Sequence, residues 1–265
     1  GVVNLGDMYE DLQSLQKEES KAYVATHIMQ FMFIGSTGFK YPVCYFPTNE
    51  MDPVTLYHKF WDVVYHLSEF DFKVLMCVCD GAQSNRTFIK CHFDDLDPAE
   101  ENFTTTNIYT GEPLTFVVDP SHNFKKLRNN LLKSTSTEKT PRHFKLDGKD
   151  ILWSHLKDAY MYDIENNTIQ TFKYLTPQHF DPGSAEKMRN YLADDVLDTR
   201  MVEVLKNYQR QSNASSSNSG AVVEKTIEFL GMTSILLKNF KNTRLYTSIE
   251  DTRFVENQRC LDWIQ

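Results

Sequence analysis

The chain has 265 residues, of which 41% are hydrophobic and 13% aromatic, and its formal net charge at pH 7 is −8. This length and apolar content allow one large domain or two small ones, while the negative charge argues against a free-standing nucleic-acid coat protein. No apolar run approaches the roughly 18 residues of a membrane span, and no signal peptide is recognisable, so we expect no membrane partner.

The first part of the chain predicts a hairpin followed by a helix. Residues 21–35 and 41–46 read as strands that are joined by a short turn. Asp52 is the expected N-cap of the next helix, and Pro53 is its expected first residue. Together with the strand that follows, these elements predict a mixed α/β sheet with a parallel crossover.

Asp80 is the strongest candidate for a functional residue. It follows the apolar run 72–79 and precedes Gly81. A short apolar run predicts a strand that is buried on both faces, and glycine allows a sharp turn after it. Asp80 should then lie at the carboxyl edge of a sheet, where open α/β sheets bind ligands. This position suits an Mg²⁺ ligand, and the alternative is a turn or helix-capping role.

One carboxylate cannot hold Mg²⁺ without further oxygen ligands. Asp119 follows a second apolar strand, residues 116–118, and is one candidate for a second acid. The sequence that precedes this chain is the other candidate. His122, three residues after Asp119, reads as a general base or ligand, or more simply as a buried, hydrogen-bonded histidine.

A helix is predicted over residues 121–133, and it carries several polar side chains that suit phosphate. Cations near the positive end of a helix favour phosphate binding, whereas a solvated helix face is the plainer alternative. Neither a Walker loop nor a GxGxxG loop is present. The candidate side chains are Lys125, Lys126, Arg128 and Asn129.

The five cysteines are odd in number and scattered, which argues against disulfides and predicts a reducing, intracellular compartment. Cys77 and Cys79 face the same side of their strand. With Cys91 and His92 they could form a metal site. Buried thiols are favoured instead, because the chain has no CxxC pair.

The character of the sequence changes near Ser134. A polar loop is followed by helical patterns, and no second sheet is evident. The sequence therefore predicts an α/β region followed by an all-helical one. The predicted helices cover residues 151–158, 185–210 and 221–239, with a flexible, low-complexity loop at 212–220.

Several strings in the chain resemble one family. The most specific are Asp80-Gly81 with Asn85, and the Asp-Pro-x-His-x-x-Lys-x-x-Arg-Asn string over residues 119–129. Through these strings nearly the whole chain resembles the P-element-type transposases, a group that includes THAP-domain transposase relatives. The other matching strings are residues 1–6, 22–33, 41–46, 153–156, 187–189 and 242–244.

This resemblance implies an RNase H-like catalytic core that is interrupted by a helical, GTP-binding insertion. It implies a carboxylate triad that holds Mg²⁺ for DNA cleavage and strand transfer, with Asp80 as the second acid. The expected domains are an RNase H-like part at 1–119, the insertion at 120–248, and the start of a return to the core at 249–265. DNA is the implied partner and the nucleus is the implied location. A homo-oligomer of the full-length protein is also compatible with this resemblance.

The GTP site that the resemblance implies involves the phosphate-binding candidates of the 121–133 helix together with Asn239 and Asn242. The family typically has an acid where this chain has Asn239, three residues before Asn242. An acid accepts two hydrogen bonds from guanine, whereas a neutral Asn both donates and accepts. We therefore expect weak or relaxed selectivity for GTP.

Other departures from the family bear on function. The first catalytic acid of the family lies ahead of the segment that matches residues 1–6, the third follows the insertion, and the N-terminal zinc finger has no counterpart here. We therefore expect a fragment of a P-element-like transposase with an incomplete triad. The alternative is a domesticated, non-catalytic relative that binds DNA, nucleotide or protein.

Overall fold

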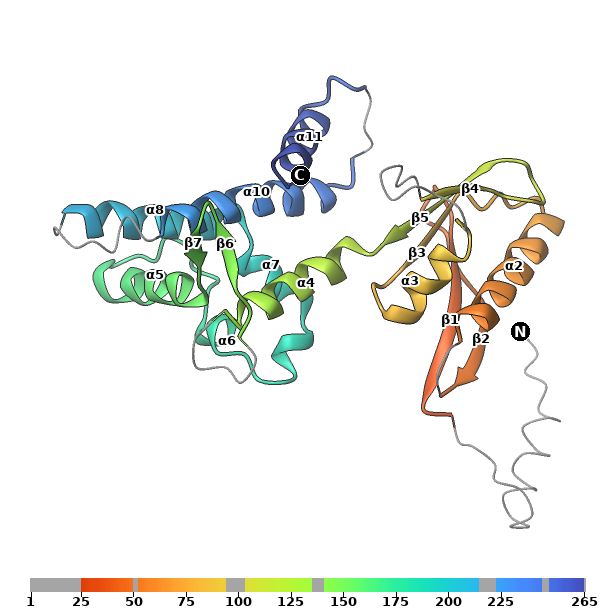
Figure 1. The fold of residues 1–265 in the computed structure, drawn as a ribbon, viewed down its shortest axis with the longest axis horizontal. Helices are drawn as coiled ribbons and strands as arrows, with labels where there is room; N and C mark the ends of the chain where they lie inside the picture. Colours follow the sequence, from red (N-terminus) through yellow and green to blue (C-terminus); the bar gives the residue numbers. More distant parts are fainter. Residues whose placement is uncertain are drawn as a thin grey trace, which may run out of the picture. The chain divides into compact units, whose positions relative to one another are not determined.

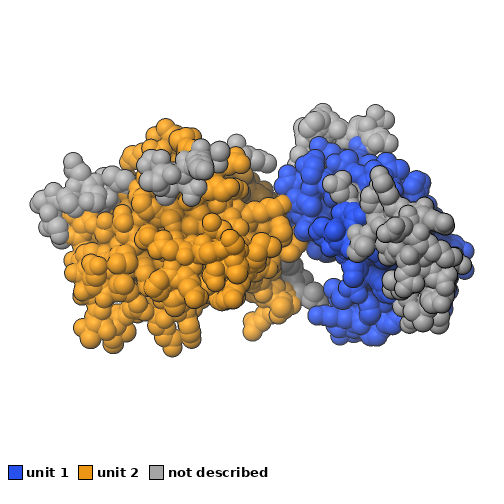
Figure 2. All heavy atoms as spheres, turned by 90° about the horizontal axis from the view of Figure 1, so that it is seen from below, with its two compact units in different colours: residues 1–118 blue, residues 119–265 orange. Residues whose placement is uncertain are grey.

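The computed structural model describes residues 25–49, 52–93, 103–134, 141–214, 223–244 and 248–264. The chain forms two compact units, Gly1–Val118 and Asp119–Gln265, which Figure 2 shows in different colours. None of the described helices is long and apolar enough to cross a membrane.

In its described residues the first unit combines an antiparallel hairpin, a three-stranded sheet and two helices (Figure 1). In the larger sheet β3 pairs in parallel with β5, and β4 pairs antiparallel with the other edge of β5. The predicted hairpin, helix and parallel strand are confirmed. The elements are β1 (His27–Ile34), β2 (Lys40–Thr48), α2 (Pro53–Glu69), β3 (Met76–Cys79), α3 (Gln83–Lys90), β4 (Thr104–Thr106) and β5 (Pro113–Val118).

Helix α2 begins where the sequence predicts. The Asp52 carboxylate accepts a hydrogen bond from the Thr55 amide at 2.9 Å, and Pro53 occupies the first turn, where no amide donor is needed. The apolar face of α2 then packs with α3 against β5. The buried side chains of this core are Leu56, Phe60, Trp61, Val64, Phe88, Ile89, Leu114 and Phe116.

The prediction that both faces of β3 are buried is wrong. Met76 and Val78 are 56% and 59% exposed, whereas Cys77 and Cys79 are half-buried and contact the core. In the described part of the chain β3 is an edge strand, and α2 and α3 supply the buried side chains for only one of its faces. Its side chains therefore alternate between core and solvent.

The second unit is mainly helical. Helix α8 packs against both α5 and α10 (Figure 1). Helix α11 packs on α10, a helix of the second unit. The return to an RNase H-like core that the sequence suggested at 249–265 stays a prediction. The elements are α4 (Pro120–Leu131), β6 (Phe144–Leu146), β7 (Lys149–Ile151), α5 (Trp153–Asn166), α6 (Pro177–Phe180), the 3₁₀ turn η1 (Glu186–Met188), α7 (Asn190–Val196), α8 (Thr199–Ala214), α10 (Glu224–Phe240) and α11 (Thr252–Ile264).

Two features of this unit differ from the sequence prediction. A small antiparallel hairpin, β6–β7, stands where only helix was expected, and its turn places Asp147 and Gly148 at positive φ. The predicted helix over 185–210 is instead divided into η1, α7 and α8. Asp198 causes the second break, because its carboxylate accepts from the Arg200 amide at 2.8 Å and starts a new helix. Most of the predicted loop 212–220 lies outside the described residues.

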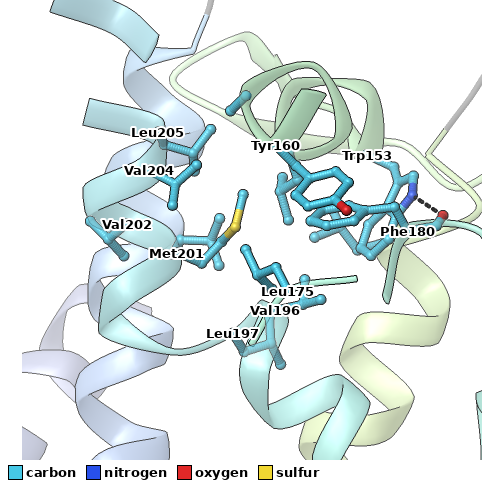
Figure 3. Close-up of a cluster of buried hydrophobic side chains, with 14 of the residues drawn as sticks. Trp153, Tyr160, Leu175, Phe180, Val196, Leu197, Met201, Val202, Val204 and Leu205 are labelled. Atoms are coloured by element: carbon cyan, nitrogen blue, oxygen red, sulfur yellow. Dashed lines mark hydrogen bonds between the residues drawn. The ribbon is translucent and has the colours of Figure 1, made fainter. Parts of the chain in front are cut away.

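The core of the second unit gathers side chains from α5, α6, α7 and α8 (Figure 3). The Trp153 indole donates to the Phe180 carbonyl at 3.0 Å, and the Tyr160 ring stacks on Phe180 with centroids 4.4 Å apart. Leu156, Leu197, Met201 and Leu205 fill the space around these rings and are fully buried.

Candidate functional site

Asp80 lies directly after β3, with an exposed side chain. Its Oδ1 atom accepts from the Ala82 amide at 2.8 Å and from the Asn85 amide group at 2.8 Å. These two bonds fix the carboxylate and stabilise the turn into α3. The turn role that the sequence allowed is therefore present. Asp80 and Asn85, which belong to the same specific string, are brought together.

The chemistry of Asp80 suits a hard cation, because a carboxylate oxygen is the ligand that Mg²⁺ prefers. A complete site needs more. In the part of the chain that the structure describes, no group of three His, Cys, Asp or Glu side chains is placed to hold a metal ion. Asp80 thus contributes one oriented acid and not a whole metal centre.

The thiols of β3 do not suit a metal site. Burial, and secondarily the neighbouring thiol of Cys79, raises the pKa of Cys77 to about 12. Burial and the charge of Asp80 raise the pKa of Cys79 to about 11. Among the described residues, which include Cys91 and His92, these thiols belong to no group of three side chains placed to hold a metal ion. Buried thiols, the favoured alternative, agree with this environment.

Asp119 begins the second unit as the N-cap of α4. Its Oδ1 atom accepts from the Ser121 amide at 2.9 Å, and Pro120 occupies the first turn. This observed role is structural, and a role as the second metal-binding acid stays a prediction. His122 is half-buried in the first turn of the same helix.

Arg128 is fully buried, so it does not lie on a solvated helix face as the plainer alternative held. Its Nη2 atom donates to the carbonyls of Glu186 and Lys187 at 3.4 and 3.3 Å. Its Nε and Nη1 atoms have no hydrogen-bond partner among the described residues. Burial lowers the pKa of Arg128, yet a guanidinium stays charged in proteins. A buried cation with unused donors calls for an acceptor.

Asn129 extends the same arrangement. Its amide nitrogen donates to the Lys187 carbonyl at 3.1 Å, while its buried Oδ1 atom has no partner among the described residues. The 3₁₀ turn η1 is thus held against α4 by both Arg128 and Asn129. Lys125 and Lys126, on the same helix, are half-buried.

Asp194 and Lys241 were not predicted from the sequence. Asp194 lies on α7, which packs against α4, and its Oδ2 atom forms an ion pair with Lys241 at 2.6 Å, just after α10. Its Oδ1 atom is buried without a partner among the described residues. Helix α4 therefore has buried hydrogen-bond donors and an acceptor without partners among the described residues, and α7 has one such acceptor. We call Arg128, Asn129, Asp194 and Lys241 the inter-helix polar group.

The two asparagines predicted near guanine have different environments. Asn239 is buried, and its amide nitrogen donates to α11 at the Glu256 carboxylate (3.1 Å), the Asn257 amide oxygen (3.0 Å) and the Arg253 carbonyl (3.4 Å). Asn242 is exposed and accepts from the Arg244 amide at 3.0 Å.

Comparison with known proteins defines the class first. Residues 1–92 match the family described as TNP-like, RNase H N-terminal domain. This segment includes β1, β2, α2, β3 and α3, and therefore the turn that holds Asp80. The match indicates that this segment is similar to the RNase H-like part of transposase-type proteins.

One solved structure is similar to most of this chain. It is described as the Drosophila P element transposase strand transfer complex, and it matches with a TM-score of 0.64 and 14% sequence identity. The likeness covers 90% of this chain and 56% of that chain, so the present chain spans just over half the length of the protein it matches. No curated protein matches the chain.

Together the two comparisons confirm the resemblance to P-element-type transposases. The predicted fold class, a partial RNase H-like α/β region followed by a helical region, is also confirmed. The correction is the β6–β7 hairpin, which means that the second unit is not entirely helical.

Proposed function

We propose that this chain is part of a P-element-like DNA transposase, and that Asp80 is one of the acids that hold Mg²⁺ for DNA cleavage and strand transfer in the full protein. The observation that carries this proposal is the match of residues 1–92 to a transposase-type RNase H domain in which Asp80 ends a strand. DNA is the partner that follows from this proposal. The family resemblance also implies a nuclear location, and the full-length protein could form a homo-oligomer.

In this proposal the bound Mg²⁺ supplies charge neutralisation at the phosphate that is cleaved. The chain supplies the position of one ligand. The Ala82 and Asn85 hydrogen bonds fix the Asp80 carboxylate before any metal arrives, which reduces the cost of ordering a ligand on binding.

We expect the isolated 265-residue chain not to nick DNA, because one carboxylate cannot assemble a two-metal site. The test incubates supercoiled plasmid with the chain in Mg²⁺ or Mn²⁺ and compares it with Asp80→Ala. Both proteins should leave the plasmid at the same low background. Robust nicking that Asp80→Ala abolishes would refute the incomplete triad.

We also propose that the inter-helix polar group, with Lys125 and Lys126, binds the guanine nucleotide that the family resemblance implies. Arg128 has unused donors for acceptors such as phosphate oxygens, and Asp194 and Asn129 have unused acceptors for donor groups. A nucleotide supplies both kinds of partner. The contacts of Asn239 support the expected weak selectivity for GTP over ATP. Its side-chain amide nitrogen already donates to Glu256 and Asn257 of α11, so it is not available to a base.

Calorimetry with GTP and ATP tests the nucleotide site. Asp194→Asn and Arg128→Gln should each weaken GTP binding about 10-fold or more, because a hydrogen bond to a charged group contributes about 1.5–3 kcal/mol. Lys133→Ala, an exposed cation just beyond α4, is the matched control and should change affinity less than twofold. Unchanged binding in the two site variants, or GTP preferred over ATP by more than about 100-fold, would contradict the proposal.

The second candidate is a domesticated relative that binds DNA, nucleotide or protein without catalysis. Asn239 favours this candidate, because it stands where the family has an acid and its side-chain amide is hydrogen-bonded to α11. The flanking genomic sequence separates the candidates. An upstream zinc finger and strand acid with a downstream Glu would favour the enzyme, and their absence would favour the binding module.

A further inference from the structure

A cavity of about 460 Å³ lies in the second unit between α6 and the segment before it, helix α7 and the start of α8. This volume is within the range of about 300–1,000 Å³ that is common for small-molecule sites. The inter-helix polar group does not line it. The lining residues are Tyr174, Thr176, Gln178, His179, Tyr191, Leu192, Asp195 and Arg200.

Two aromatic rings at the cavity are open to solvent. Tyr174 and Tyr191 are 58% and 53% exposed. Burying a tyrosine ring against another group is energetically favourable, so these two rings have surface available for a ligand. Lys173 lies 5.1 Å from the Tyr174 ring centre, and Arg189 donates to the Tyr191 hydroxyl at 3.1 Å. Exposed aromatic rings with neighbouring cations are the combination that proteins use to stack unpaired bases and to hold the adjoining phosphates.

Arg200 is held rigidly at the same cavity. Its guanidinium lies 4.1 Å from the centre of the Phe172 ring, and its Nε and Nη2 atoms donate to the two carboxylate oxygens of Asp198 at 2.7 and 3.1 Å. The Asp198 carboxylate binds the Nε and Nη2 edge of the guanidinium. The Nη1 atom has no hydrogen-bond partner among the described residues. An anchored arginine loses little freedom when it binds a phosphate.

The wall of the cavity carries a fixed polar pair. The ring of His179 is nearly fully buried, and its Nδ1 atom accepts from the Thr176 backbone amide at 3.0 Å. Because that amide can only donate, Nε2 carries the hydrogen and donates to Asp195 at 3.3 Å. The Asp195 carboxylate is thereby positioned as an acceptor, which suits the exocyclic amino group of a base.

From these features we propose that this cavity binds one unpaired nucleobase, with the base stacked on Tyr174 or Tyr191 and its phosphate near Arg200. The base comes from single-stranded nucleic acid or from a free nucleotide, and the chemistry of recognition is the same. The site lies apart from the nucleotide site proposed above and does not depend on it.

Fluorescence anisotropy with a labelled single-stranded (dC)₈ octamer, on the full 265-residue chain, tests this proposal. Whichever of Tyr174→Ala and Tyr191→Ala removes the ring that stacks on the base should weaken binding about 5-fold to 150-fold, as expected for the loss of one base–aromatic stack. The other variant should have a smaller effect. Tyr174→Phe and Tyr191→Phe keep the ring and should stay within about twofold of the unmodified chain. Tyr41→Ala removes an equally exposed tyrosine from the first unit and should have no effect.

Two further arms locate the phosphate and identify the source of the base. Arg200→Gln should reduce the dependence of binding on salt by about one phosphate contact. Competition by dCMP at a concentration near the octamer's Kd would assign a free nucleotide, and its failure to compete would assign a strand. Octamer binding that survives both alanine variants, or an octamer that does not bind at all, would overturn the proposal.

Discussion

Asp80→Asn is expected to reduce metal-dependent DNA cleavage about a thousandfold in the full-length transposase of which we propose this chain is a part. This factor corresponds to about 4 kcal/mol of lost transition-state stabilisation. Asparagine keeps an Oδ1 acceptor for the Ala82 and Asn85 hydrogen bonds, so the turn into α3 should persist. What is lost is the negative charge that a divalent cation requires. Cleavage of labelled transposon-end DNA in Mg²⁺ measures the effect.

The control for this prediction is Asp52→Asn. Asp52 is an exposed carboxylate in the same unit that caps α2, and asparagine caps helices as well as aspartate does. Its cleavage rate should stay within about twofold of the unmodified protein. If Asp80→Asn also stays within twofold, Asp80 serves only the turn and the metal role is wrong.

Trp153→Ala should lower the free energy of unfolding of the second unit by about 3–5 kcal/mol, the range found for large aromatic residues in cores. The indole fills the space between α5 and α6 (Figure 3), and it satisfies the Phe180 carbonyl at 3.0 Å. Urea unfolding followed by far-ultraviolet circular dichroism gives the measurement.

Trp153→Phe separates the two contributions in this core. It retains most of the volume and removes the hydrogen bond, so its loss of about 1–3 kcal/mol should reflect the unpaired carbonyl. Met188→Ala, at a side chain that is 68% exposed, should change stability by less than about 0.5 kcal/mol. A Trp153→Ala variant as stable as Met188→Ala would show that this cluster does not support the fold.

Some local signals in the sequence predicted the structure correctly. Asp52, followed by proline, caps α2 as predicted. Asp119, which the sequence suggested as a metal-binding acid, is also followed by proline and caps α4, which begins one residue before its predicted start. The short β6–β7 hairpin was missed even though Asp147-Gly148 is a strong turn signal, because three-residue strands are too short to show alternation. The break at Asp198 was missed because the apolar periodicity continues across it.

The inter-helix polar group could not be predicted from the chain alone. Periodicity marks one apolar face per helix, whereas Arg128 and Asp194 are buried by neighbours that are distant in the sequence. A buried charge looks like a surface charge until those neighbours are placed. Asp80 was easier to find, since a strand that ends in an acid and a glycine is a local pattern.

The contact between Asn239 and Glu256 has a consequence for altering base preference. An engineer who restores an acid with Asn239→Asp would place two carboxylates at the 3.1 Å separation that now joins an amide to a carboxylate. Repulsion between like charges would then push α11 from α10 or keep one acid protonated. A paired exchange, Asn239→Asp with Glu256→Gln, avoids that conflict, so under the proposed nucleotide role a change toward guanine selectivity requires two coordinated substitutions.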